Sequence, residues 1–268
     1  MRIPITIDPV TEPPTPLASA ATPSPRTVLV TGASRGLGLC ISSELARSGY
    51  RVIALARTSS PALSEVAESS GSGAAGDVIF QAYDLLATDG IAALVSDLCE
   101  EFGPLYGLIN NAGAGTGGLL AGMALADIDQ LVRLNTVAPM VLAQQCLTRM
   151  TAARTGRIVN IASVAALSGY AGLSVYSATK ASLIGFTRAL AREVGRYDIT
   201  VNAIAPGFIA TDMTRDLGEE QLAKIRGRSA LGRLAEPIDV ARSVLYLLSE
   251  AGRNLTGSVI TIDAGNTA

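Results

Sequence analysis

Short apolar segments alternate with longer helical patterns along most of this 268-residue chain, and this alternation limits the possible folds more than any other feature. Successive strands separated by helices predict a parallel sheet, because each helix carries the chain back to the starting edge. We therefore expect an α/β fold with a doubly wound, mostly parallel sheet of about seven strands and helices on both faces.

The expected strands are short and rich in Val, Ile, Leu and Ala, and comprise residues 27–31, 51–56, 78–83, 108–110, 157–162, 200–204 and 258–263. The expected helices show apolar residues at helical spacing and comprise residues 39–48, 60–69, 89–102, 127–150, 174–195 and 236–249. The chain contains no internal repeat. One domain of this length accommodates the whole pattern.

Residues 1–25 depart from this pattern, since seven of the 12 prolines lie there. Proline interrupts both helices and sheets, and the segment has little apolar surface to bury. We predict a flexible tail at 1–25 and a catalytic domain at 26–268. A docking arm on a neighbouring subunit is the alternative for the tail. The segment lacks the apolar run of a signal peptide.

The composition excludes several functions. The chain has no histidine, so it cannot build a Ser-His-Asp or Cys-His nucleophile or an imidazole zinc site, and we expect no metal. A net charge of −2 argues against nucleic-acid binding. The longest uncharged stretch contains asparagines and many glycines, so no membrane span is expected. Cys40, Cys99 and Cys146 are far apart and predict free thiols in a reducing compartment, the cytoplasm.

A glycine-rich loop follows the first expected strand. Glycine there allows a tight turn and close approach of the backbone to a pyrophosphate, which the N-terminus of the next helix then attracts. This context predicts a dinucleotide site of the Rossmann type. The residues expected to bind the cofactor here are Gly32, Ala33, Ser34, Arg35, Gly36, Leu37 and Gly38, which follow Thr31.

The end of the second expected strand indicates which dinucleotide is bound. An NAD-binding Rossmann fold places an acidic residue there to hold the ribose 2′-hydroxyl. This chain has Ala56 at that place, followed by Arg57. An arginine attracts a 2′-phosphate and can hold it with two hydrogen bonds. Arg57, together with Arg35, therefore predicts NADP(H).

Three polar residues predict the reacting groups. Tyr176 and Lys180 are four residues apart on an expected helix and share one of its faces. Ser163 ends the expected strand at 157–162, which places it at the same edge of the sheet. A free tyrosine has a pKa of about 10, and a nearby ammonium group favours the phenolate. Lys180 is thus expected to adjust the pKa of Tyr176, which replaces histidine as proton donor.

These features together resemble the short-chain dehydrogenase/reductase family, over essentially residues 26–268. The motifs that carry the resemblance are TGxxxGxG at 31–38, NNAG at 110–113, the Ser163, Tyr176 and Lys180 set, and the PG pair at 206–207. The resemblance implies that Lys180 binds the nicotinamide ribose and that Ser163 contacts the substrate oxygen. It also implies that Asn135 holds a water that relays protons to Lys180.

The resemblance extends the expected cofactor site. Asp84 and Leu85 correspond to a pair that contacts adenine, and Arg35 to a residue that meets the 2′-phosphate. Asn110 to Gly113 are implied to steady the sheet and line the cofactor, and the stretch from Ile209 to about Leu231 to form a substrate lid. The further cofactor residues implied are Asn111, Ala112, Gly113, Tyr176, Lys180, Pro206, Gly207, Ile209 and Thr211.

Within the family, the chain most resembles the 3-oxoacyl-[acyl-carrier-protein] reductases, through residues 175–194 and 205–215. This implies NADPH-dependent reduction of a 3-oxoacyl thioester, with acyl carrier protein as a partner. The carrier-docking arginines of those reductases correspond to Val141 and Tyr197, although Arg188 and Arg196 lie nearby. A ketoreductase of a specialised pathway, acting on a polyketide or free ketone, therefore stays open, as does a non-catalytic NADP-binding regulator.

The resemblance also implies a homo-oligomer, a dimer or tetramer. Its pairing surface is expected around the helices that carry Asn135 and Tyr176. Cys146 and Met150 lie on the first of these expected helices. We expect both side chains to contribute to that interface.

Overall fold

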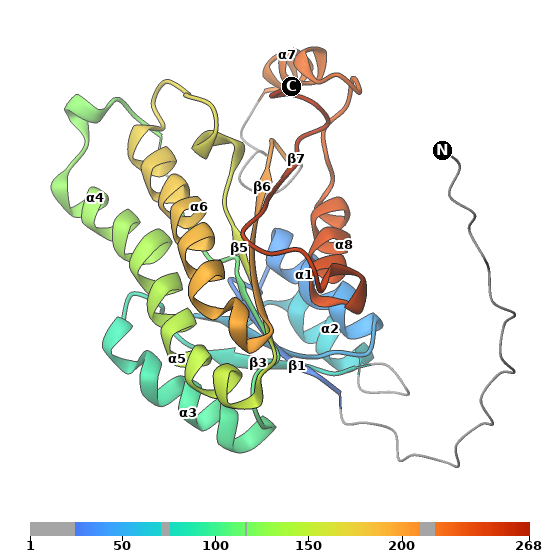
Figure 1. The fold of residues 1–268 in the computed structure, drawn as a ribbon. Coiled ribbons are helices and arrows are strands. Elements are labelled where there is room, and N and C mark those ends of the chain that lie inside the picture. The colour runs from blue at the N-terminus through green and yellow to red at the C-terminus, as the bar shows by residue number, and fades with distance from the viewer. Residues whose placement is uncertain (1–24, 71–75, 116, 210–217) are drawn as a thin grey trace, which may run out of the picture.

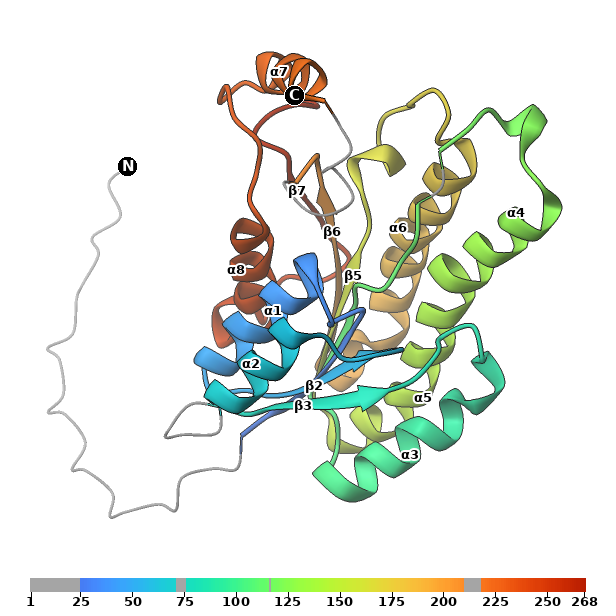
Figure 2. The same cartoon turned by 180° about the vertical axis from the view of Figure 1, so that it is seen from behind.

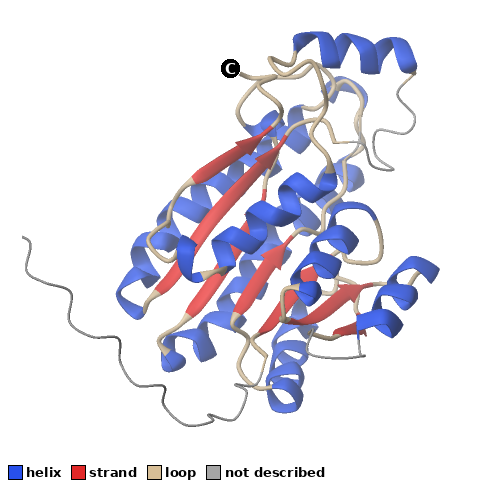
Figure 3. Ribbon diagram, turned by 90° about the vertical axis from the view of Figure 1, so that its right-hand side faces the viewer, coloured by secondary structure: helices blue, strands red, loops and turns tan. Residues whose placement is uncertain are grey.

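A seven-stranded parallel sheet runs through the centre of the computed structural model, which describes residues 25–70, 76–115, 117–209 and 218–268 (Figures 1 and 3). The strand order is β3-β2-β1-β4-β5-β6-β7, and every neighbouring pair is parallel. The strands are β1 Thr27–Thr31, β2 Arg51–Ala56, β3 Val78–Ala82, β4 Gly107–Asn110, β5 Gly156–Ile161, β6 Ile199–Pro206 and β7 Val259–Ile262. The predicted fold class is confirmed.

Helices cover both faces of this sheet. The helices α1, α2 and α8 lie on one face, and α3, α4, α5 and α6 lie on the other (Figures 1 and 2). Their bounds are α1 Gly36–Arg47, α2 Pro61–Ser70, α3 Ile91–Phe102, α4 Leu125–Val132, α5 Ala138–Ala153, α6 Ser174–Val194, α7 Glu219–Arg228 and α8 Pro237–Leu248. The helix α7 lies apart from both layers, beyond the carboxyl ends of β6 and β7 (Figure 1).

The strands are apolar throughout because both faces are buried. Side chains alternate between the faces along each strand. In β1, Val28 and Val30 pack in the core beneath α1 and α8, whereas Leu29 packs in the core beneath α3 and α5. All three are fully buried. The high hydrophobic content of the chain, 49%, follows from this two-sided burial.

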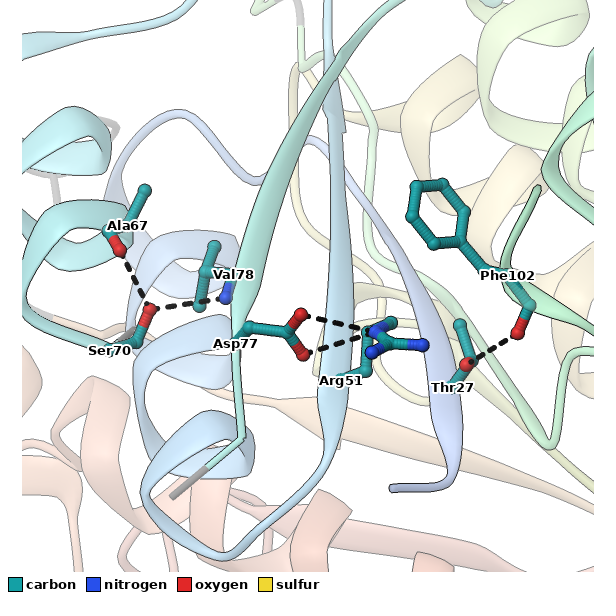
Figure 4. A network of polar contacts seen from close by, with 7 residues as sticks. All are labelled: Thr27, Arg51, Ala67, Ser70, Asp77, Val78 and Phe102. Atoms are coloured by element: carbon teal, nitrogen blue, oxygen red, sulfur yellow. Dashed lines mark hydrogen bonds and ion pairs between the residues drawn. The ribbon is translucent and has the colours of Figure 1, made fainter. Parts of the chain in front are cut away.

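Polar contacts fix the amino-terminal edge of the sheet (Figure 4). The Arg51 Nε donates to both carboxylate oxygens of Asp77, at 3.1 and 3.2 Å, which joins the start of β2 to the residue before β3. The hydroxyl of Ser70, the last residue of α2, accepts a hydrogen bond from the Val78 N–H at 3.1 Å. These contacts set where the edge strand β3 begins.

The predicted long helix at 127–150 is confirmed as one helical run from Leu125 to Ala153, but its middle is not α-helical. The chain forms α4, then a π-helical turn at Arg133–Val137, then α5. Pro139 has no N–H to give to the carbonyl of Asn135 four residues earlier, and this accounts for the local loss of α pairing. Single π turns of this kind occur frequently at functional sites.

Cys146 and Met150 do not reach a subunit surface, contrary to our expectation. Both side chains are buried in the core beneath α5, with exposed fractions of 1% and 0%. The helix presents a different side outward. Cys99 is also a buried free thiol, whereas Cys40 is only half-buried.

None of the helices among the described residues combines the length and apolarity needed to cross a membrane. The first 24 residues, where the tail is predicted, lie outside the described residues.

We predict that Leu108→Ala lowers the free energy of unfolding by about 2–5 kcal/mol, because Leu108 is fully buried in β4 and its truncation leaves a cavity. Urea unfolding followed by circular dichroism measures the change. Leu119→Ala is the matched control, since Leu119 is 75% exposed. Equal effects of the two substitutions would contradict this description of the core.

Candidate active site

The parallel sheet brings the carboxyl ends of β1, β4, β5 and β6 to one edge, where ligands of doubly wound sheets bind. The residues predicted from sequence follow these strands. They therefore lie on one side of the molecule, and their local contacts show what each contributes.

The glycine loop depends on the close approach of two backbone segments. Gly32 has a φ of +66°, a conformation that favours glycine. A Cβ on Gly38 would lie 2.2 Å from the Gly32 carbonyl oxygen and 2.6 Å from the Asn111 Nδ2. Only glycine fits at position 38. The loop is consequently held tight against the start of α1.

The Thr31 hydroxyl fastens this loop to the end of β4. It accepts hydrogen bonds from the N–H groups of Asn111 and Ala112, at 3.0 and 2.9 Å, and donates to the Ile109 carbonyl at 3.2 Å. The Asn111 Nδ2 returns a hydrogen bond to the Thr31 carbonyl at 2.8 Å. The glycine loop and the residues after β4 therefore form one rigid unit.

The N-terminus of α1 is open to an anion. Its N-cap residue, Arg35, makes no side-chain capping hydrogen bond. The N–H groups of the first turn, at Gly36, Leu37 and Gly38, have no partner within an α-helix and carry partial positive charge. Ala33 and Ser34 complete the turn, and the Ala33 N–H is bonded to the Leu55 carbonyl.

Two arginines flank this end of the site. Arg35 follows the loop turn and Arg57 follows β2, and both side chains are exposed. In the described part of the chain, neither forms an ion pair. Ala56, the last residue of β2, brings no carboxylate to this place. Both guanidinium groups are therefore available to a phosphate.

Asp84 and Leu85 follow β3 and contribute differently. The Asp84 Oδ1 accepts a hydrogen bond from the Leu86 N–H at 3.0 Å, which closes a local turn. Leu85 is 6% exposed and packs in the core beneath α3. Of this pair, only Asp84 is exposed.

Ser163 lies just beyond β5 and caps the short helical turn that follows. Its Oγ accepts a hydrogen bond from the Ala165 N–H at 3.1 Å. This bond occupies the oxygen and leaves the hydroxyl hydrogen to donate. The hydroxyl is placed to donate toward the phenol of Tyr176, and this interaction acts to lower the Tyr176 pKa.

Burial dominates the ionisation of Tyr176. Its pKa is raised above 10 because removal from water disfavours the phenolate, and the Ser163 bond only partly opposes this. The Lys180 Nζ lies 5.9 Å from the centre of the Tyr176 ring. At this distance the charge of Lys180 does not overcome the effect of burial on the pKa of the phenol.

Lys180 is anchored inside the site. It is 4% exposed, and its Nζ donates to the Ile161 carbonyl, at the end of β5, at 2.8 Å. Burial lowers its pKa to about 8. Two of the three ammonium hydrogens remain for a ligand. A Cβ on Gly113 would lie 3.1 Å from this Nζ, so glycine at 113 leaves the space beside Lys180 open.

Asn135 connects two walls of the site from the π turn. Its Oδ1 accepts from the Ala114 N–H at 2.9 Å, and its Nδ2 donates to the Ala114 carbonyl at 2.8 Å and to the Thr179 hydroxyl at 3.1 Å. The side chain is fully buried. These contacts hold the loop after β4 against α6, next to Lys180.

Asn110 performs a similar task inside the sheet. Its Nδ2 donates to the Asn160 Oδ1 at 2.8 Å, and the Asn160 Nδ2 donates to the Thr187 hydroxyl at 2.9 Å. A chain of side-chain hydrogen bonds thus links β4 to β5 and β5 to α6. It fixes the helix that carries Tyr176 and Lys180.

The end of β6 closes the site on the far side. The Gly207 N–H bonds to the Ile262 carbonyl at 2.9 Å, and a Cβ at 207 would lie 2.6 Å from the Asp263 Cβ. Pro206 ends the strand, and Ile209 is buried and bridges to Ala235. Thr211 and part of the predicted lid lie outside the described residues.

Residues 26–222 match the family model for short chain dehydrogenases. The chain belongs to this short-chain dehydrogenase family. It is therefore an oxidoreductase that acts on hydroxyl or ketone groups and binds a nicotinamide cofactor.

Curated relatives of this short-chain dehydrogenase match along nearly their whole length. The chain is 41% identical to the 3-oxoacyl-[acyl-carrier-protein] reductase of Pseudomonas aeruginosa, covering 90% of this chain and 96% of that protein. It is 38% identical to the enzyme of the same name from Aquifex aeolicus and 37% identical to the one from Homo sapiens, each covering 88% of this chain and 95% of the relative.

Solved structures agree in fold. A short-chain dehydrogenase/reductase from Serratia marcescens matches with a TM-score of 0.84 at 31% identity, over 92% of this chain and all of that one. A structure from Beutenbergia cavernae, described as an NAD(P)-dependent gluconate 5-dehydrogenase with NADP at low occupancy, matches with a TM-score of 0.85 at 33% identity. That match covers 91% of this chain and 98% of the other.

The residues present fit a nicotinamide dinucleotide. The tight glycine loop gives the backbone room to approach the pyrophosphate, and the uncapped N-terminus of α1 offers N–H donors to it. Lys180, with open space beside its Nζ, offers a donor to the ribose. No cluster of three or more metal-ligating side chains occurs within the described ranges.

Sequence reasoning missed Thr31 and Thr179 as connecting residues. Thr31 bonds to both residues that follow Asn110, and the Thr179 hydroxyl joins Asn135 to the Tyr176 carbonyl, which it meets at 2.8 Å. Only their positions in the sequence could have indicated these roles: Thr31 ends a strand before a glycine, and Thr179 precedes Lys180. A hydroxyl at such positions has many local partners, so position does not single out these contacts.

We predict that the stability contributed by Lys180 rises with pH. Its folded pKa of about 8 lies below the ordinary 10.5, so between these values the unfolded chain binds more protons. The free energy of unfolding of the wild type, relative to Lys180→Met, is therefore expected to increase by roughly 2–3 kcal/mol from pH 7 to pH 10. Urea unfolding at several pH values measures this.

Lys224→Met is the matched control, because Lys224 is the only other lysine and is exposed in an ion pair with Glu220. Its difference from the wild type is expected to stay constant over the same range. If the free energy of unfolding changed with pH in the same way for the wild type and Lys180→Met, the pKa of Lys180 would not be lowered by burial in the folded protein.

Proposed function

We propose that this short-chain dehydrogenase reduces a 3-oxoacyl thioester, carried on acyl carrier protein, to the 3-hydroxyacyl form, with NADPH as reductant. The observation that carries the proposal is the convergence of Ser163, Tyr176 and Lys180 at the end of β5. The 41% identity to a reductase of that name over 96% of its length supports the substrate class.

The nicotinamide cofactor, when bound, supplies the hydride to the substrate carbonyl carbon. Tyr176 donates its phenolic proton to the carbonyl oxygen, which develops negative charge during that transfer. Its raised pKa keeps the phenol protonated before the reaction, which suits a proton donor. The Ser163 hydroxyl hydrogen, left free by the bond from Ala165, donates to the same oxygen.

Lys180 has two roles in this proposal. Its remaining ammonium hydrogens bind the nicotinamide ribose, and its charge favours the phenolate once Tyr176 has given up its proton. Asn135 positions Lys180 by holding the loop at Ala114 against Thr179. In the same scheme, Lys180 gives a proton to the Tyr176 phenolate and a water near Asn135 returns one to Lys180, which restores both groups.

NADPH is favoured over NADH by the exposed pair Arg35 and Arg57 and by the absence of a carboxylate at position 56. The relative from Beutenbergia cavernae with bound NADP supports the same choice. Two guanidinium groups without ion-pair partners in the described chain suit a 2′-phosphate.

A ketoreductase that acts on a polyketide or a free ketone is the second candidate, and the surface near α5 and α6 favours it. Val141 packs partly against the core, and Tyr197 lies beneath two guanidinium groups, with Arg196 4.8 Å and Arg154 6.0 Å from its ring centre. Neither Val141 nor Tyr197 offers a positive charge to an acidic carrier protein. Arg188, which is exposed on α6, does offer a positive charge.

We also infer a homo-oligomer, as in the family. Val132 in α4 and Val137 in the π turn are 39% and 37% exposed, which supports a contact surface on that side.

We predict that the wild type oxidises NADPH with acetoacetyl-carrier protein and that Tyr176→Phe retains NADPH binding but loses turnover by about 10²–10⁴-fold, the usual contribution of a general acid. Loss of absorbance at 340 nm measures turnover, and fluorescence titration measures binding.

Tyr246→Phe is the control for removing one phenolic hydroxyl, since Tyr246 is exposed on α8, away from Ser163 and Lys180. Turnover of free ketones but not of thioesters would favour the second candidate. Tight NADPH binding without turnover of any ketone would instead favour a non-catalytic regulator. Near-normal activity of Tyr176→Phe would remove the residue from its role.

We predict that Arg57→Asp raises the Kd for NADPH by at least tenfold while changing the Kd for NADH much less. The substituted carboxylate repels the 2′-phosphate and can accept a hydrogen bond from the 2′-hydroxyl. Arg47→Asp is the control, because Arg47 ends α1 at the opposite end of the helix and is also exposed. An unchanged preference in Arg57→Asp would refute NADPH selection by this residue.

A further inference from the structure

A hollow of about 330 Å³ lies beyond the carboxyl ends of β6 and β7, at the lower end of the range for ligand pockets. Its wall comes from three parts of the chain: the β5–α6 connection, the residue after Gly207, and α7 with the final turn. The residues used below are Ser168, Tyr170, Phe208, Ile225, Arg228 and Asn266.

The hollow is lined in part by segments that continue from the reacting groups and from the end of β6. Ser168 and Tyr170 belong to the connection that starts after Ser163 and runs into the helix that carries Tyr176. Phe208 directly follows Pro206 and Gly207 at the end of β6. A substrate whose carbonyl meets Ser163 and Tyr176 can therefore extend toward this hollow.

The lining of the hollow combines two kinds of chemistry. Tyr170 and Phe208 contribute aromatic rings, with ring centres 6.0 Å apart in an edge-to-face arrangement. Arg228 is the only charged side chain among the described residues that line the hollow. A ligand that fits has an apolar part and one negatively charged group.

Arg228 differs from the other cations of α7. Lys224 pairs with Glu220 and Arg226 pairs with Glu219, whereas Arg228 has no ion-pair or hydrogen-bond partner among the described residues. The nearest acidic side chain of the final turn, Asp263, accepts hydrogen bonds from Thr267 and Gly265 and is used within that turn. The Arg228 charge is therefore left to a ligand.

The wall that carries Arg228 is held in place. The Asn266 Nδ2 donates to the Ile225 carbonyl at 3.4 Å, and the Leu231 N–H donates to the Ala264 carbonyl at 3.1 Å. The final turn thus fastens the C-terminal end of α7. A side chain at position 228 is presented to the hollow by a tethered helix.

We propose that this hollow binds an oxyanion, a phosphate ester or a carboxylate, at the end of the carbonyl substrate remote from the ketone, and that Arg228 pairs with it. The proposal rests on the proposed reductase function. In it, Tyr170 and Phe208 line the intervening part of the substrate, and Arg228 selects charged substrates over neutral ones.

Two matched pairs of acetoacetyl thioesters test this with NADPH. Pantetheine against 4′-phosphopantetheine tests the phosphate, and N-acetylcysteamine against N-succinylcysteamine tests the carboxylate. We expect the charged member of at least one pair to have a kcat/KM about tenfold higher, mainly through KM, as a charge-assisted hydrogen bond would give. In Arg228→Gln this ratio is expected to fall near one, and in Arg228→Lys to recover in part.

Arg226→Gln is the matched control, because Arg226 lies on the same helix but does not line the hollow; its ratio is expected to match the wild type. A wild-type ratio near one for both pairs, or a ratio that survives Arg228→Gln, overturns the proposal while leaving the reductase function intact. Calorimetry with 4′-phosphopantetheine tests the oxyanion site separately from the reductase function. Binding that depends on Arg228, without turnover of any thioester, supports the oxyanion site and refutes the reductase function.

Discussion

The parallel pairing of β1, β4, β5 and β6 is the constraint on which the site depends. Parallel strands end at one edge, so residues far apart in the chain meet there without any long loop to place them. Thr31 and Asn111 then join the ends of β1 and β4, while Asn110 and Asn160 join β4 to β5. The sheet sets the positions of the ends, and these polar contacts determine how precisely the ends are held.

The ionisable groups of the site are controlled mainly by burial. Removal from water raises the pKa of Tyr176 and lowers that of Lys180, so both shifts favour the neutral forms. The two groups therefore move apart in proton affinity: the Tyr176 phenol keeps its proton near neutral pH, whereas the Lys180 ammonium gives one up more readily than an ordinary lysine. This solution does not require histidine, in agreement with a chain that has none.

The sequence predicted those helices and strands that are determined by a local pattern, such as an apolar run between turn residues. The strands β1 and β2 have the predicted bounds, because apolar runs between turn residues mark buried strands clearly. The predicted helix at 127–150 is present, but its π turn was not predicted, because the missing N–H at Pro139 changes the pairing of Asn135 without changing the hydrophobic spacing. The outward placement of Cys146 and Met150 failed because α5 packs on a sheet whose position depends on distant segments.

The site likewise contains residues that a local pattern predicts and residues that only the structure reveals. Ser163, Tyr176 and Lys180 are recognisable from spacing after a strand, whereas Arg228 is recognisable only once the final turn is seen beside α7. That proximity has a consequence for any change near the final turn. The Leu231 N–H and the Ile225 carbonyl take their hydrogen-bond partners from residues 264 and 266, so loss of those contacts would release the wall that carries Arg228 while leaving the sheet and the glycine loop intact.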